Sequence, residues 1–136
     1  MIDTNDRTLA AALEWAMEAQ SLPIPEDRVV GCYYVPRIRQ TRRSIDLGRF
    51  FAFPNEMQIL VLNSLSDEET FRTLLHEARH LWQYQMGHLS WSAGQQYWLG
   101  APDADYERSG AERDANEWAG LMLAPLLDHL RSNGLL

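Results

Sequence analysis

Cysteine is almost absent from this chain of 136 residues, and lysine is absent altogether. The single cysteine, Cys32, excludes an internal disulfide and any zinc knuckle built from several cysteines, and we expect it to be a buried, inert thiol. Nineteen acidic against twelve basic residues give a net charge of −7, which argues against nucleic-acid binding. No apolar run reaches the ~18 residues of a membrane helix, and the acidic N-terminus is unlike a signal peptide. We therefore expect a soluble, cytoplasmic protein that binds no membrane.

The chain does have enough apolar surface for one core. Hydrophobic residues make up 46% of the sequence, so residues 1–136 are expected to form a single domain. Residues 54–56 have turn chemistry, which predicts an antiparallel hairpin around them. The expected chain begins with a helix over 4–20, capped by Thr4 or Asn5, and continues with strands over 28–35, 45–53 and 57–63. A helix over 67–86 follows and starts at a capping box formed by Ser66 and Glu69. An ordered loop over 88–105 then leads to a helix over 106–123, which Pro125 breaks or kinks.

The helix over 67–86 contains a pattern with specific chemistry. Residues 76–80 read His-Glu-Ala-Arg-His, which is HExxH. A four-residue spacing advances about 400° around a helix, so His76 and His80 project from nearly one face, as two ligands of a tetrahedral zinc ion do. Glu77 lies beside them, where it can act as the general base that takes a proton from water and passes it to the leaving amine.

The residues after the second histidine separate the classes of zinc peptidase. The metzincin pattern requires Gly and His at the positions that hold Gln83 and Met86, and His88 comes two residues late. That class is therefore disfavoured. HExxH can also arise by chance on the solvated face of an amphipathic helix, so a metal-free structural or interaction domain is one alternative.

A third ligand can come from the helix predicted downstream. In residues 112–119, Glu112 shares a helical face with two alanines and with Asn116. Small alanines allow close packing on the first helix, so Glu112 could reach the same ion. Asn116 could accept a hydrogen bond from the free ring nitrogen of a ligand histidine. Two histidines and one glutamate leave the fourth zinc position open for water, as in catalytic sites.

Together these two segments resemble the ImmA/IrrE-like metallopeptidases. The pattern of that family is HExxH followed about thirty residues later by ExxAN-x-aromatic-A and a hydrophobic stretch that ends in proline. Here HEARH at 76–80 is followed by ERDANEWAGLMLAP at 112–125, and the resemblance covers about residues 57–125. The chain departs from the pattern in carrying Trp118 where Phe is commoner and in a longer loop between the motifs.

The resemblance implies a minimal gluzincin-type zincin fold that binds Zn²⁺. His76, His80 and Glu112 would be the zinc ligands, and Glu77 the general base. Members associated with phages and mobile elements cleave transcriptional repressors, so the implied partner is a protein or peptide substrate, such as a repressor.

Substrate binding and charge stabilisation need further groups. The strand over 57–63 leads directly into the motif helix, so an extended peptide is expected to pair along it as an added strand. The charge that develops on the scissile carbonyl oxygen needs a further hydrogen-bond donor. Tyr106 is the first candidate for this donor. Behind it come His88, Tyr97 and Arg113, and each of the four could equally be an ordinary surface or packing residue.

We therefore predict one compact, zincin-like α+β domain, with a small, mostly antiparallel sheet packed on the HExxH helix and a second metal-ligand helix. Its predicted function is zinc-dependent peptide-bond hydrolysis. The alternative is a catalytically silent zincin-like protein that binds metal and engages a regulatory partner through the same cleft. The presence of Glu77 disfavours this alternative, because an inactive enzyme commonly loses the general base first.

Overall fold

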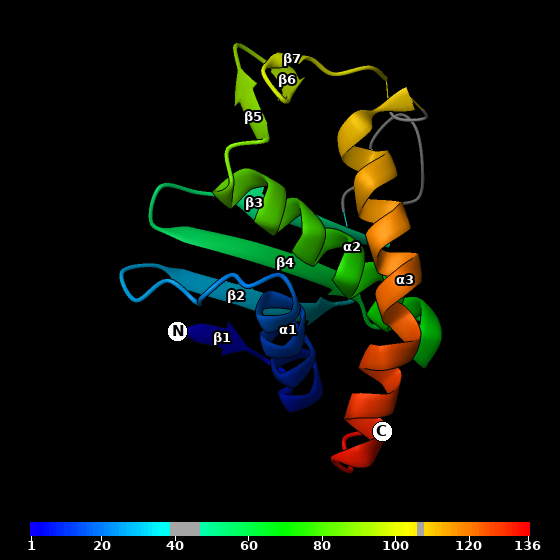
Figure 1. Ribbon diagram of the computed structural model, residues 1–136. Coiled ribbons are helices and arrows are strands. Elements are labelled where there is room, and N and C mark those ends of the chain that lie inside the picture. Colours follow the sequence, from blue (N-terminus) through cyan, green and yellow to red (C-terminus); the bar gives the residue numbers. More distant parts are fainter. Residues whose placement is uncertain (39–46, 106–107) are drawn as a thin grey trace.

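The computed structural model describes residues 1–38, 47–105 and 108–136, and it confirms the α+β class (Figure 1). Among these residues, no helix combines the length and the apolar character that crossing a bilayer requires. The elements, in chain order, are β1 (Ile2–Thr4), α1 (Arg7–Ala19), β2 (Val29–Val35), β3 (Gly48–Ala52), β4 (Glu56–Leu62), α2 (Asp67–Gln85), β5 (Leu89–Ser92), β6 (Gln95–Trp98), β7 (Ala101–Pro102) and α3 (Gly110–Ser132).

The larger sheet has the strand order β1-β2-β4-β3. β2 pairs in parallel with both β1 and β4, whereas β3 and β4 form an antiparallel hairpin. The predicted hairpin of 45–53 with 57–63 is confirmed, although residues 45 and 46 lie outside the described residues. β4 is an interior strand with both edges paired, so the expected pairing of a peptide along 57–63 is wrong. The outer strand on this side of the described sheet is β3.

The N-terminal segment contains a strand that the sequence did not predict. β1 pairs with β2 so that Thr4 lies opposite Cys32, and α1 begins only after it. The N-cap is Asp6 rather than Thr4 or Asn5, and its side chain accepts a hydrogen bond from Leu9 N–H at 3.0 Å. Cys32 is fully buried, and burial raises the pKa of its thiol to about 12, which agrees with the expected inert thiol.

Helices α1 and α2 pack on one face of the larger sheet, and α3 packs on both of them (Figure 1). Met57, Ile59 and Val61 alternate along β4 and are fully buried beneath the helices. The predicted start of α2 is confirmed, because Ser66 Oγ accepts a hydrogen bond from Glu69 N–H at 3.2 Å. The strands of the larger sheet that α2 contacts most, β3 and β4, are therefore the ones that directly precede it in the chain.

Helix α3 begins and ends later than predicted. Its N-cap is Ser109, whose side chain accepts a hydrogen bond from Glu112 N–H, and the predicted start at Tyr106 lies outside the described residues. The helix continues through Pro125 to Ser132, so the expected end near 123 is wrong. Proline lacks the N–H that would bond to the carbonyl of Leu121. Both of these side chains are exposed, so water can reach this side of the helix.

Residues 88–105, predicted as an ordered loop, contain a second sheet. β5, β6 and β7 pair antiparallel through two-residue turns at Ala93-Gly94 and Leu99-Gly100. All four turn residues have positive φ, as the tight turns that match strand twist require. Alanine and leucine rarely adopt positive φ, which is why the sequence did not indicate these turns. Across both sheets, three of the five described strand pairings are antiparallel. In the sheet that packs on α2, however, two of the three pairings are parallel, so this sheet is mixed and not mostly antiparallel as predicted.

Candidate metal centre

Packing of α2 against α3 brings three predicted ligands together. His76 Nε2 lies 2.8 Å from Glu112 Oε2, and His80 Nε2 lies 3.1 Å from Glu112 Oε1. The two Nε2 atoms are 3.1 Å apart. Donor atoms on one tetrahedral zinc ion are separated by roughly 3.3 Å, given zinc–nitrogen bonds of about 2.0 Å. His76, His80 and Glu112 therefore lie close enough together to hold one metal ion.

The orientation of His80 follows from its neighbour Gln83. The Gln83 side-chain amide donates to Ala111 O and to Asp114 Oδ2, both at 2.9 Å, so its oxygen is the atom that faces His80 Nδ1 at 2.8 Å. That oxygen can only accept, so Nδ1 carries a proton. With Nδ1 protonated, His80 directs Nε2 at the Glu112 carboxylate. Either a proton on Nε2 or a metal cation then has to lie between the two groups.

Glu112 leads to the same conclusion. Its Oε2 atom is buried and, within the described part of the chain, has no well-aligned hydrogen-bond partner despite the nearby imidazole of His76. A buried carboxylate oxygen without a partner is costly unless a cation satisfies it. Two imidazole nitrogens and one carboxylate are donors that bind divalent transition metals well, so the residues present fit a metal ion.

The electrostatics of the cluster favour positive charge. Burial alone lowers the pKa of His80, but the contact with Glu112 and the nearby Glu77 carboxylate outweigh this and raise the pKa to about 9. Burial alone raises the pKa of Glu112, but the adjacent imidazoles outweigh it and lower the pKa to about 2. The cluster thus holds a carboxylate ionised in a place where an added cation is stabilised.

Glu77 is buried beside the cluster, at 8% exposure. It lies at the meeting point of α2 and β3, because a Cβ on Gly48 would come within 3.3 Å of Glu77 Cγ. The same Cβ would lie 2.9 Å from Leu60 O and even closer to Thr73. A glycine at position 48 therefore allows the outer strand to approach the helix next to Glu77.

The residue that orients a ligand histidine is not the predicted one. Asn116 is exposed, and no hydrogen bond joins it to either imidazole in the described residues, so its expected role is wrong. Gln83 makes this contact instead and is completely buried. Its position was informative, since a residue three places after His80 lies next to it on the helix.

The predicted donors for the carbonyl oxygen have different outcomes. Tyr106, the first candidate, lies outside the described residues. The ring of His88 packs edge-on against the indoles of Trp82 and Trp98, with centroids 5.2 and 6.2 Å away, and so serves as a packing residue. Tyr97 is half-buried on β6, and Arg113 is exposed on α3. The role of any of these four residues as the donor to the scissile carbonyl oxygen stays a prediction.

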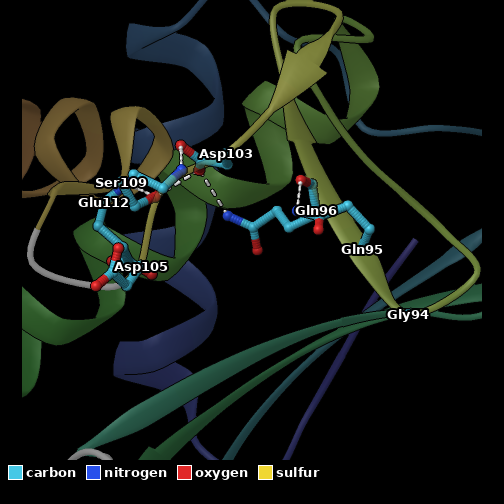
Figure 2. A pocket seen from close by; sticks show the side chains of 8 residues that line it. Gly94, Gln95, Gln96, Asp103, Asp105, Ser109 and Glu112 are labelled. Carbon is cyan, nitrogen blue, oxygen red and sulfur yellow. Dashed lines mark hydrogen bonds between the residues drawn. The ribbon is translucent and has the colours of Figure 1, made fainter.

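A polar pocket of about 380 Å³ opens between the second sheet and the start of α3 (Figure 2). Gln95 and Gln96 lie on one side, with Asp103, Asp105 and Glu112 on the other. Glu112 belongs both to the pocket and to the ligand cluster, so the pocket adjoins the candidate metal centre.

Comparison with protein-family models, with curated proteins and with solved structures finds no match to this chain. The fold and the site therefore define the protein only by its structure. It is an α+β domain in which two helices present a His-His-Glu group at metal-binding distance.

Proposed function

We propose that this protein is a zinc-dependent peptidase with the ligands His76, His80 and Glu112. One observation carries the proposal: the carboxylate of Glu112 comes from a separate helix, meets both imidazoles of the HExxH motif and leaves one oxygen without a well-aligned hydrogen-bond partner in the described residues. Zinc, when bound to three such ligands, acts as a Lewis acid that polarises a carbonyl and makes water a nucleophile at neutral pH.

The chain's own residues supply the remaining steps. Glu77, buried beside the ligands, takes a proton from the attacking water and returns it to the leaving amine. The amide of Gln83 holds His80 in the orientation that directs Nε2 at the ligand cluster. The role given to Glu77 is the one that the HExxH pattern assigns to the glutamate next to the two histidines.

The substrate proposed is a peptide segment of another protein, such as the transcriptional repressor that the family resemblance implies. β3 is the outer strand of the described sheet, and it passes directly beside Glu77 at Gly48. An extended peptide paired along this edge through main-chain hydrogen bonds would lie close to the general base. β3 thus takes the place that the sequence had suggested for residues 57–63.

Metal content tests the ligand set. Protein purified without added metal is expected to contain one zinc ion per chain by mass spectrometry of the elements, and His80→Ala is expected to lose it. The matched control is His88→Ala, which removes an imidazole packed against two indoles and should keep the metal. Wild-type protein without stoichiometric zinc would instead indicate a metal-free structural domain.

Cleavage tests the role of Glu77. Glu77→Gln is expected to retain zinc and to lower cleavage of a proteome-derived peptide library by about 10²- to 10⁴-fold, the usual contribution of a general base. Glu68→Gln, at an exposed position of the same helix, should leave both unchanged. A zinc-loaded wild type that cleaves nothing, and that binds a partner no differently from Glu77→Gln, would favour the catalytically silent alternative.

A further inference from the structure

Gln83 is a fully buried polar side chain in the core between α2 and α3. It uses its whole side-chain amide: the oxygen accepts from His80 Nδ1, and the nitrogen donates to Ala111 O and to Asp114 Oδ2. A buried amide that is satisfied on both sides has one preferred orientation. Gln83 also connects the two helices that carry the ligands, because Ala111, which it contacts, directly precedes Glu112.

Asp114 is in turn held by Arg79, the residue before His80. Arg79 Nε donates to Asp114 Oδ2 at 2.7 Å, and a second guanidinium nitrogen lies 3.3 Å from Oδ1. The guanidinium stacks over the indole of Trp82, 3.8 Å from its centroid, with Trp118 on α3 at 5.5 Å. A forked ion pair of this kind has a defined geometry, so it restrains the carboxylate that Gln83 contacts.

We propose that Gln83 is the positioning residue of the metal centre. It fixes the Nδ1–H form of His80, and through Ala111 and the Arg79–Asp114 pair it keeps His80 correctly placed relative to Glu112. The inference rests on the proposed function, since it concerns residues that contact the proposed metal ligands and not the metal itself. It adds a role for two residues, Gln83 and Arg79, that the HExxH motif does not specify.

The test uses Gln83→Met, which keeps the side-chain length and removes the acceptor. Zinc affinity, measured by competition with a chromophoric chelator, is expected to fall by about tenfold to a hundredfold, the usual cost of losing such a contact. The visible absorption spectrum of the cobalt(II)-substituted protein should also change, because a reoriented His80 alters the ligand field. Gln85→Met is the matched control, since Gln85 contacts Met57 and not the ligands, and it should change neither readout.

Each outcome is decisive. A folded Gln83→Met protein with wild-type zinc affinity and cobalt spectrum overturns the inference and leaves the proposed function standing. Wild-type protein that binds no zinc overturns the proposed function itself. If Gln83→Met does not fold, Asp114→Asn at a half-buried position replaces it: an affinity loss of several-fold supports the inference, and unchanged affinity overturns it.

Discussion

A single glycine shows how closely the surroundings of Glu77 are packed. Gly48 lies where the outer strand crosses α2, and any side chain there would meet Thr73 and the carbonyl of Leu60. Glu77 is the next group that such a side chain would approach. The close packing of β3 against α2 at this point thus depends on a residue that has no side chain.

Gly48→Ala is therefore expected to destabilise the fold by about 1–3 kcal/mol, the usual cost of overpacking. Urea unfolding followed by circular dichroism measures the change. Gly120→Ala is the matched control, because nothing lies within 4 Å of a Cβ built at that helical position, and it should be neutral or stabilise by roughly 0.5–1 kcal/mol. Equal unfolding midpoints for the wild type and Gly48→Ala would contradict the packing described for β3.

Among the elements, the start of α3 determines where Glu112 lies. Ser109 caps the helix, and Asp103, just after β7, accepts hydrogen bonds from Ser109 Oγ and from Gly110 N–H. Gln96 donates to the same carboxylate from β6. The second sheet and the first turn of α3 are thus joined by one aspartate, with Glu112 three residues after the cap.

This joint predicts a local pH dependence. Burial alone raises the pKa of Asp103, but the hydrogen bonds from Ser109, Gln96 and two backbone N–H groups outweigh it and lower the pKa below the ordinary value of 3.8. A carboxyl with a lowered folded-state pKa contributes stability above its unfolded pKa, and this is lost as the pH falls through the folded pKa. The first turn of α3 is therefore expected to loosen only in strongly acidic solution.

The Gly110 amide resonance in NMR spectra reports this loosening. It should titrate with a midpoint below 3.8, the ordinary value for Asp103, and Asp103→Asn should remove that titration. Asp128→Asn, at an exposed site on the same helix, should leave it in place. A midpoint at or above the ordinary value would show that the hydrogen bonds to Asp103 do not stabilise its charged form.

What the sequence could predict also differs between elements. α2 was predicted closely, because its cap at Ser66, its apolar stripe and its HExxH spacing are all local. β1 could not be predicted, since a three-residue strand depends on pairing with residues 30–32. The second sheet was not predicted because its two-residue turns use positive φ at Ala93 and Leu99, residue types that rarely adopt it.

The site was partly predictable for the same reason. HExxH places two imidazoles on one helical face by spacing alone, and the alanine-rich face after Glu112 indicated close packing. In the sequence, Gln83 only argues against the metzincin pattern, although helix spacing also puts it beside His80. The prediction for Asn116 is wrong because the rotation of α3 about its axis decides which of its residues face the imidazoles. Tertiary contacts such as that between Arg79 and Asp114 set this rotation, and the local sequence pattern does not contain them.

At the scale of the whole molecule, a bound ion would join parts of the chain that are distant in sequence. His80 and Glu112 belong to different helices separated by the entire second sheet. An ion that binds only the folded state adds stability according to its concentration relative to its Kd. The proposed centre should therefore affect global unfolding and not only activity.

Zinc at about a thousand times its Kd is expected to stabilise the protein by about 4 kcal/mol, which corresponds to a rise in melting temperature on the order of 10 °C for a chain of this size. Differential scanning calorimetry with zinc, and again after EDTA, measures the shift. His80→Ala should show almost no response to zinc. An equal response in that variant would place the ion elsewhere.

The order in which the ligands occur along the chain has a consequence for biosynthesis. The imidazoles are translated first, and Glu112 follows on α3. The segment after α3 contacts α1 through a hydrogen bond from Thr8 Oγ1 to the carbonyl of Leu135. A nascent chain that has not yet released α3 from the ribosome offers two of the three ligands and lacks the helix that positions Gln83. Under the proposed function, the peptidase would remain inactive until α3 has left the ribosome and packed on α2.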